Sequence, residues 1–538
     1  MPAPTGGKCE TRLGSLWQRF FRLRHVPKSA RSRDTPNPLR RVLGAPELIA
    51  LGVGGIIGAG IYVLTGAVAS QHAGPAVCLS FVLSGSSCAL AALCYAELAS
   101  MIPAAGSAYV YAYATMGEAM AWTIGWSLVL EYLFTVGLVS IGWSGYFSSL
   151  LRDIGILLPP EWTAPYGTHL VQLPGQGWVI ATGELAQWLR GHGVHMEDLP
   201  QASGWVNVPA VAIVLSLSAL LVLGIRESAT LNTAIVLFKT GALLCFVAAA
   251  FRYLTTHPEV WHQNWDPFVP PNRGEFGQFG WSGVLRGAGM IFFAYLGFDV
   301  VSTAGQEAKN PQRDLPIGIL GSLSLCTILY VLVAIALTGA VHYSRLAVPD
   351  PIAVGVEAIG ARWLAPVVKL GAISGISSVI LVFLLGQSRI FWAMAEDGLL
   401  PPHLARIHPR FQTPYVATVV SGVAGALLGA FCPILVLNEL VSIGTLFAFI
   451  LVCLGVLILR HTQPELPRPF RVPWVPWLPL AGVGICFLQM VSLPARAWAR
   501  LILWLILGWA LYLGYGIHRS KACQELPAPS PKSASPGA

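Results

Sequence analysis

The sequence predicts an all-α polytopic membrane protein of about twelve spans, arranged as an inverted repeat of five plus five helices with two further C-terminal transmembrane helices. Three observations lead to this prediction. The 538-residue chain is 55% hydrophobic and 11% charged, whereas soluble proteins carry about 25% charged residues. Apolar runs close to the ~20 residues that cross a bilayer recur along most of the chain. The first and sixth of these runs are interrupted at corresponding positions, which is typical of inverted repeats.

The chain divides into three parts. Residues 1–45 form a basic N-terminal tail, residues 46–517 form the transmembrane domain, and residues 518–538 form a Pro/Ser/Ala-rich tail that we expect to be disordered. The third span is expected to be one long helix, tilted or broken, with a candidate break at Glu118 beside Gly117. The predicted spans, in order, are 46–70, 75–97, 107–147, 205–225, 232–252, 283–305, 316–342, 366–395, 413–433, 438–460, 473–494 and 498–517.

The distribution of charge predicts the topology. Basic residues gather in the N-terminal tail and in the loops of one side, so the positive-inside rule places both termini in the cytoplasm. The loop 148–204 holds more acidic than basic residues and is expected to be extracellular. The plasma membrane is the expected location, with a vacuolar or lysosomal membrane as the alternative. The net charge of +8 does not indicate nucleic acid as a partner, because the basic residues lie in tails and short loops.

The first interrupted run is the glycine-rich stretch Gly52–Gly66. Each glycine inside a helix costs about 1 kcal/mol relative to alanine, and unwound backbone in a membrane is tolerated only where it is buried in protein or lines a cavity. If this stretch unwinds, the amides of Gly58, Ala59 and Gly60 lie at the N-terminus of a half-helix, which favours a carboxylate. The alternative is an unbroken helix whose small residues allow close packing.

The second interrupted run is Phe292–Asp299, in the sixth span. Its position five spans after the first, in the opposite orientation, is what an inverted repeat of five helices would give. The alternative is a packing glycine, Gly297, next to an intramembrane aspartate.

Several segments of the chain resemble the amino acid–polyamine–organocation superfamily and, within it, the cationic amino acid transporter family. The segments that carry the resemblance are Gly54–Gly66, Cys94–Glu97, Pro103–Tyr109, Phe292–Asp299, Asn310–Pro311, Arg389–Pro401 and Leu466–Pro473. The resemblance covers about 45–517. It implies a LeuT-type fold and secondary active or facilitative transport of amino acids by alternating access. It favours cationic L-amino acids such as arginine and lysine as substrates.

The resemblance also implies how the substrate backbone is held. Amides of Gly58, Ala59 and Gly60 would bind the carboxylate, and carbonyls of both broken helices would bind the ammonium. Those carbonyls belong to Ile56, Phe293, Ala294 and Leu296. Many relatives carry Ser or Thr at the position of Ala59, so one hydroxyl that could meet the carboxylate is absent here.

Lys239 lies near the middle of the fifth span, where a charged residue is costly and by default indicates function. Its position resembles that of a lysine which replaces the sodium ion beside the first helix in proton-linked relatives. Buried lysines shift readily toward neutrality, so Lys239 is a candidate for proton coupling. The alternative is a structural lysine that bonds a carbonyl group.

Three further residues are candidates for the substrate pocket. Glu131, in the third span, either faces the cavity to meet a cation or pairs within the protein. In the eighth span, Ile376 pointing inward would favour small neutral substrates, whereas Ser377 pointing inward would admit a longer side chain. The sequence leaves both choices open.

Other function classes remain as alternatives. A proton-coupled permease for neutral, alanine-like amino acids would share these features, and so would an amino acid sensor that does not transport. An enzyme is not expected, because the chain shows no nucleophile constellation, and the pair His192 and His195 has weak metal-ligand spacing. We therefore expect no metal and no cofactor, with a proton gradient as a candidate driving force. The expected partners are an amino acid substrate and the lipid bilayer, without an obligate protein partner.

Overall fold

The computed structural model describes residues 43–101, 107–173, 177–181, 185–186, 189–190, 194–223, 229–303, 305, 308–411 and 413–521. Most of the predicted N-terminal tail (1–42), most of the C-terminal tail (522–538) and part of one family-like segment (103–106) lie outside these residues. The α-helices are α2 Ala45–Ile56, α3 Thr65–Val68, α4 Val77–Met101, α5 Ser107–Thr115, α6 Glu118–Asp153, α8 Val208–Val222, α9 Ala229–Thr256, α10 Pro258–Trp265, α11 Gly280–Ile291, α12 Val300–Thr303, α13 Pro311–Ala340, α14 Pro351–Ala358, α15 Ala365–Glu396, α16 Tyr415–Phe431, α17 Ile434–Thr462, α18 Trp477–Ser492, α19 Ala495–Leu511 and α20 Ile517–Arg519. The strands are β1 His169–Leu173, β2 Gly177–Ile180 and β3 Gln201–Ser203.

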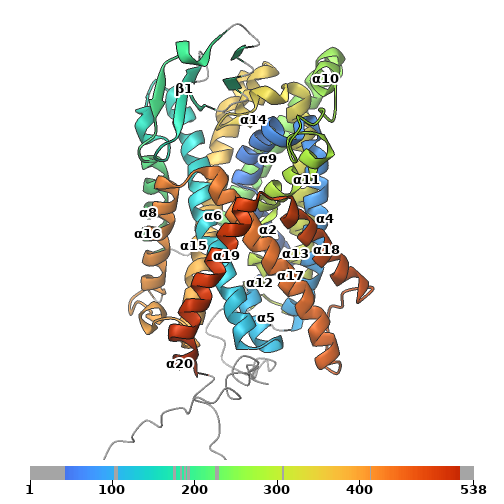
Figure 1. Cartoon of the computed structure of the whole chain (residues 1–538), viewed down its shortest axis with the longest axis vertical. Coiled ribbons are helices and arrows are strands. Elements are labelled where there is room, and N and C mark those ends of the chain that lie inside the picture. The colour runs from blue at the N-terminus through green and yellow to red at the C-terminus, as the bar shows by residue number, and fades with distance from the viewer. Residues whose placement is uncertain are drawn as a thin grey trace, which may run out of the picture.

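The long helices run side by side in one bundle (Figure 1). The small sheet lies at one end of this bundle together with α10 and α14. We call this end of the bundle the sheet end. α5 and α20 lie at the opposite end, which we call the α20 end (Figure 1). Within the bundle, α6 packs against α15, α16 and α17, while α13 packs against α2 and α4.

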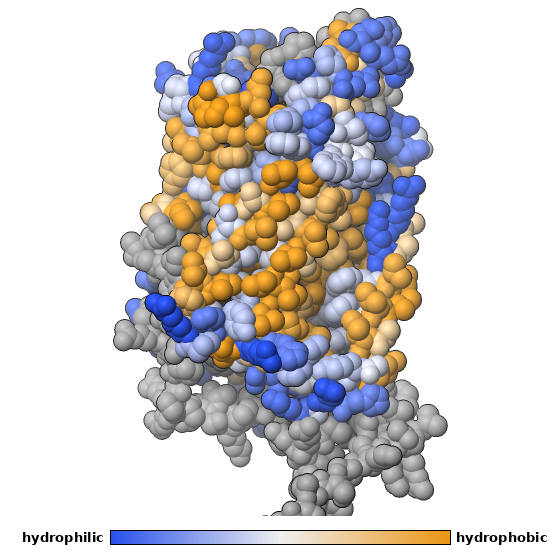
Figure 2. All heavy atoms as spheres, turned by 90° about the vertical axis from the view of Figure 1, so that its left-hand side faces the viewer, coloured by the Kyte–Doolittle hydropathy of each residue, from blue (hydrophilic) through white to orange (hydrophobic). Residues whose placement is uncertain are grey.

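The helices confirm the predicted all-α polytopic class. Among the described residues, eight helical segments are long and apolar enough to cross a membrane, and shorter apolar helices include α2, α8, α16 and α18. Each of the predicted spans coincides with one of these helices or with a broken pair. Figure 2 shows the outer face on the side of α8 and α16, where a broad apolar band lies between two polar ends. Leu215 of α8 and Val423 and Leu427 of α16 are exposed apolar side chains, as expected for helices that face lipid.

The third span is broken where the sequence indicated. Gly117 has φ 96°, a left-handed conformation that glycine adopts without the usual steric cost. It separates α5 from α6, which starts at Glu118. With 36 residues, α6 is about 54 Å long and therefore extends beyond a hydrocarbon core of about 30 Å.

The segment 148–204 contains a three-stranded antiparallel sheet in the order β2-β1-β3. β1 places Leu170, Val171 and Leu173 in buried positions. Leu173 joins Val179 and two leucines of the same segment in a small apolar cluster of their own. No pattern in the sequence predicted this folded unit.

Candidate functional site

The first predicted break is present in the structure. α2 ends at Ile56, Ile57 has extended backbone angles (φ −73°, ψ 101°), and a π-helical turn follows at Gly60–Leu64. The new helix starts with a bond from the Tyr62 amide to the Gly58 carbonyl, at 3.2 Å. Among the described residues, the backbone hydrogen bonds formed outside regular helices and strands include none that is donated by the amides of Gly58, Ala59 or Gly60. These amides can therefore bind an anion at the start of the second half-helix.

The second predicted break is also present. α11 ends at Ile291, a 3₁₀ turn covers Phe292–Tyr295, and Leu296 is extended (φ −61°, ψ 142°). Gly297 then adopts φ 117°, which strongly favours glycine. The Asp299 carboxylate accepts a bond from the Gly297 amide at 3.2 Å and one from the Tyr132 hydroxyl at 2.5 Å. Asp299 thus caps the break and ties it to α6.

The two breaks lie against each other. A Cβ atom placed on Gly60 would lie 2.3 Å from the Ala294 Cα, and one placed on Gly297 would lie 2.6 Å from the Gly55 carbonyl carbon. The glycines are therefore required by close backbone contact, and the same contact brings the open amides of the first break near the backbone of the second. The first span is thus broken, and its glycines also allow the two breaks to pack closely.

Lys239 joins α9 to the first break. Its ammonium donates to the Gly54 carbonyl at 2.6 Å, to the Ile57 carbonyl at 2.8 Å and to the Ser378 hydroxyl at 3.1 Å. The side chain is fully buried. Because an ammonium has three N–H donors, these acceptors satisfy its protonated form, whereas a neutral amine has only two.

Helix α15 forms one wall beside the breaks. Gly375 and Ser378 face Lys239, since a Cβ on Gly375 would lie 2.9 Å from the lysine Cδ. Val379 faces Gly58, with its Cγ2 2.7 Å from a Cβ placed there. Ile376 is fully buried and lies one helical turn before Val379, on the same side of α15.

Ser377 occupies a different face of α15. Its hydroxyl donates to the Ile373 carbonyl at 2.8 Å and accepts from the Trp143 indole at 2.9 Å. The Ser377 hydroxyl is therefore engaged with its own helix and with α6.

Glu131 lies on α6 in the interior. It is fully buried, and both carboxylate oxygens lack a hydrogen-bond partner among the described residues. Thr135, one turn further along α6, and Thr445 of α17 also hold buried hydroxyls without such a partner. Glu131 is next to Tyr132, which binds Asp299 at the second break.

The structure brings most of the predicted backbone site together, and it also shows bonds that the sequence did not indicate. The Ile56 carbonyl accepts a bond from the Tyr330 hydroxyl at 2.8 Å, and the Phe293 carbonyl accepts one from the Leu296 amide at 3.1 Å. Ala294 lies at the contact between the breaks. The contact between Ser378 and Lys239 was not predicted, because only the rotation of α15 relative to α9 decides which serine of this stretch faces Lys239. Among the described residues, no group of three metal-ligating side chains is present.

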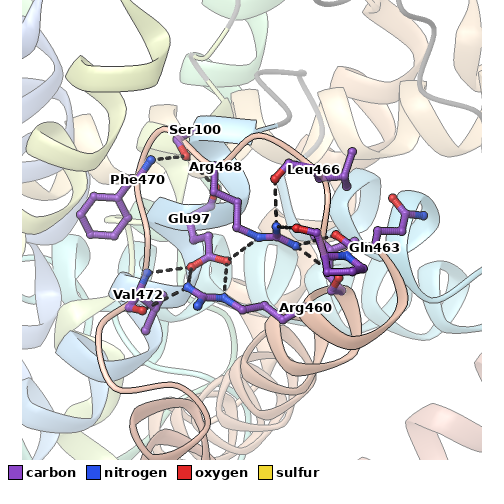
Figure 3. Close-up of polar contacts among 10 residues, drawn as sticks. Glu97, Ser100, Arg460, Gln463, Leu466, Arg468, Phe470 and Val472 are labelled. Atoms are coloured by element: carbon purple, nitrogen blue, oxygen red, sulfur yellow. Dashed lines mark hydrogen bonds and ion pairs between the residues drawn. The ribbon is translucent and has the colours of Figure 1, made fainter.

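A second polar cluster joins the C-terminal ends of α4 and α17 (Figure 3). The buried Glu97 carboxylate of α4 accepts from Arg460 Nη2 at 2.6 Å and from the Val472 amide at 2.7 Å, and Arg468 Nε lies 3.5 Å away. Arg468 also donates to the carbonyls that follow α17, including that of Gln463. Glu97 therefore fastens α4 to the end of α17 and to the segment after it.

Glu97→Gln is expected to destabilise the protein, because it leaves two arginines around a neutral amide. Removing one partner of a buried ion pair costs about 3–5 kcal/mol, and the lower end applies because the Arg460 side chain is 26% exposed. The thermal midpoint of the purified protein in detergent measures the effect. Glu439→Gln is the matched control, since Glu439 pairs with Arg500 at 2.8 Å in a more exposed position. Equal midpoints for the two variants would contradict this role of Glu97.

Comparison with known protein families decides the family. The model described as amino acid permease matches residues 43–511. The chain belongs to the amino acid permease family. This confirms the resemblance to the amino acid–polyamine–organocation superfamily, while membership of its cationic branch stays a proposal.

Proteins similar to this permease are named for different substrates. The branched-chain amino acid permease BcaP of Bacillus subtilis is 41% identical over 94% of this chain and 99% of its own length. The methylthioribose transporter of the same species is 39% identical over 90% of this chain and 95% of its own. The vacuolar cationic amino acid transporter 4 of Arabidopsis thaliana is 38% identical over 80% of this chain and 65% of its own.

A solved structure of MhsT in complex with L-phenylalanine is similar in fold. The TM-score is 0.51 with 15% sequence identity, over 87% of this permease and 99% of MhsT. The likeness concerns the fold alone, and it confirms the expected LeuT-type architecture.

Proposed function

We propose that this permease transports neutral L-amino acids with apolar side chains by alternating access. The observation that carries the proposal is the apolar wall beside the open amides, where Ile376 is buried and Val379 faces Gly58. Ser377, the residue that would have widened the pocket, bonds to Trp143 and Ile373 instead. The similarity to a branched-chain amino acid permease over nearly its whole length supports the same substrate class.

In this proposal the substrate backbone binds at the two breaks. Its carboxylate accepts from the amides of Gly58, Ala59 and Gly60, where the half-helix dipole favours an anion. Its ammonium is bound by carbonyls of the two breaks. The carbonyls of Ala294 and Leu296 are the strongest candidates, because those of Ile56 and Phe293 already accept one bond each. Binding of both groups then joins the two broken helices, and the helices α2, α4, α11–α12 and α13 move against the rest.

Lys239 is proposed to couple this movement to protons. The protonated side chain holds the carbonyls of Gly54 and Ile57 together with Ser378. Loss of the proton removes one donor and weakens the link between the first break and α15. The sheet end is proposed to face outward and both termini to face the cytoplasm, since the segment 148–204 carries few basic residues.

Transport of cationic amino acids is the second candidate function. Its support is Glu131, whose buried carboxylate has no hydrogen-bond partner among the described residues and would suit a distal cation. Relatives named cationic amino acid transporters support it as well.

A competition assay tests the choice between these substrates. Uptake of labelled leucine into proteoliposomes is expected to be inhibited by excess isoleucine and to be unaffected by arginine or methylthioribose. The Glu131→Gln variant is compared with the wild type in the same assay. If the substrates are neutral amino acids, this variant is expected to keep its preference for leucine. Inhibition by arginine that disappears in Glu131→Gln would favour the cationic assignment instead. Inhibition by methylthioribose but not by isoleucine would contradict the assignment to apolar amino acids.

A further inference from the structure

The start of α6 holds a buried carboxylate that accepts hydrogen bonds from three hydroxyl groups. Glu118 is 3% exposed. Its carboxylate accepts from Tyr113 of α5 at 2.9 Å, from Tyr512 at 3.0 Å and from Ser520 at 2.6 Å. Tyr512 and Ser520 follow α19 and lie 394 and 402 positions after Glu118 in the chain. The break in the third span therefore receives residues 512–521, which we call the C-terminal segment.

The C-terminal segment also reaches the end of α15. The Lys521 amide donates to the Asp397 carbonyl at 3.0 Å, and the Lys521 ammonium lies 3.7 Å from the Glu396 carboxylate. Gly398 follows α15 with φ 81°, and a Cβ atom placed on it would collide with the Arg519 carbonyl oxygen. Close backbone contact therefore seats the C-terminal segment against α15 as well as α6.

Helix α5 bonds to the same two places. Tyr113 donates to Glu118, and the Tyr109 hydroxyl donates to the Asp397 carboxylate at 2.7 Å. α5 also packs against α4 and α12, which are among the helices proposed to move. α5 thus links the moving helices to α6 and α15, and the C-terminal segment contacts both of its attachment points.

Helix α19 gives the C-terminal segment a fixed base on α6. The rings of Trp126 and Trp504 stack with their centroids 4.6 Å apart. The Trp126 indole donates to the Trp504 carbonyl at 2.8 Å, and the Trp504 indole donates to the Trp126 carbonyl at 3.1 Å. The Trp122 indole donates to the Gly508 carbonyl at 2.9 Å. Because these contacts do not involve Glu118, the C-terminal segment can leave Glu118 while α19 stays attached to α6.

We infer that Glu118 is a positioning residue for alternating access, and that the C-terminal segment closes on it as a latch that keeps the α20 end shut. The two latch hydroxyls orient the Glu118 carboxylate, which also accepts from Tyr113. The Lys521 contacts fix the end of α15 that binds Tyr109. The inference rests on the alternating access of the proposed function and is independent of the substrate.

The latch acts through the bonds of α5. Opening of the α20 end requires α4 and α12 to move away from α15, so α5 must give up at least one of the bonds made by Tyr109 and Tyr113. While the latch is closed, both acceptors are held in place and this loss is costly. Release of the latch frees the Glu118 carboxylate and lets α5 leave with the moving helices.

Two cysteine probes test the latch in the full-length protein in nanodiscs. Maleimide labelling is read by peptide mass spectrometry, which separates each probe from the native cysteines. Ala112→Cys reports on the α20 end, because Ala112 is buried in α5. Ala67→Cys reports on the sheet end, where Ala67 lines a cavity of about 680 Å³.

Ser520→Ala combined with Tyr512→Phe removes two of the three hydroxyls from Glu118. Loss of ordinary hydrogen bonds of this number shifts an equilibrium about tenfold. We therefore expect this latch variant to label about tenfold faster at residue 112 and more slowly at residue 67, because opening of one end closes the other. If the combined variant does not fold, Ser520→Ala alone is measured, and a smaller acceleration at residue 112 is expected.

Ser421→Ala combined with Tyr515→Phe is the matched control. The Ser421 hydroxyl donates to the Ala417 carbonyl of its own helix at 2.7 Å, and phenylalanine keeps the ring that the Arg519 guanidinium covers at Tyr515. The control is expected to label at the wild-type rate at both probes. Size-exclusion profiles in detergent establish that both combined variants fold.

Three results would overturn the inference. An unchanged rate at residue 112 would mean that the C-terminal segment does not hold α5. Faster labelling at both probes would mean that the substitutions loosen the whole fold. Faster labelling at residue 112 with an unchanged rate at residue 67 would mean that α5 frays locally. Leucine uptake tests the proposed function separately, since opposite changes at the two probes in a protein that does not transport leucine would reject the substrate and keep the latch.

Discussion

Gly58→Leu is expected to abolish uptake of every amino acid while the protein still reaches the membrane. A Cβ at this position would lie 2.7 Å from Val379 Cγ2 and 3.3 Å from Val379 Cβ. The rest of a leucine side chain would fill the space in front of the open amides, where the substrate carboxylate is proposed to bind. Overpacking of this kind costs about 1–3 kcal/mol of folding free energy, so we expect the variant to fold. The blocked carboxylate site is expected to stop transport.

Initial uptake rates in proteoliposomes, normalised to reconstituted protein, measure this effect. Gly484→Leu is the matched control, because Gly484 lies in α18 with open space around it. The control is expected to transport at the wild-type rate. Substantial transport by Gly58→Leu would refute the assignment of the carboxylate site to the first break.

Lys239→Ala is expected to remove the stimulation of uptake by an acidic exterior. The variant deletes the contacts with Gly54, Ile57 and Ser378, so no proton-dependent link remains between the first break and α15. The substitution also leaves these buried acceptors without a hydrogen-bond donor. We therefore expect the uptake rate at neutral pH to fall as well. The ratio of uptake at acidic and neutral external pH is the decisive quantity.

Lys309→Ala is the control for this experiment, since Lys309 is exposed and should keep the full acid stimulation. Size-exclusion profiles of both variants in detergent establish that they fold. An unchanged pH ratio in a folded Lys239→Ala protein would reduce Lys239 to a structural residue and remove the proton from the mechanism.

The sequence predicted the two breaks because their signals are local. Glycines at Gly55, Gly58 and Gly60 inside an apolar run, and Gly297 beside Asp299, are costly in an ordinary transmembrane helix. The same local rule predicted the break at Gly117. The spans followed from hydropathy, because the bilayer imposes one length on nearly all of them.

The remaining contacts were not predictable, because they join residues far apart in the chain. Glu97 and Arg460 are separated by 363 positions, and Ile56 and Tyr330 by 274. Their pairing depends on which helices are neighbours, and hydropathy carries no information on this. The choice between Ile376 and Ser377 also needed the rotation of α15, which Trp143 and Lys239 reveal. The strands of the 148–204 segment are short and weakly patterned, so they gave no signal.

Leucine uptake by the purified wild-type protein in proteoliposomes, with and without an inward proton gradient, tests the central claim most directly. The proposed mechanism predicts that leucine enters and that the gradient drives it to a higher internal concentration than outside. Entry that stops at equal concentrations despite the gradient would contradict proton coupling. The absence of any leucine entry would contradict the transport of neutral amino acids.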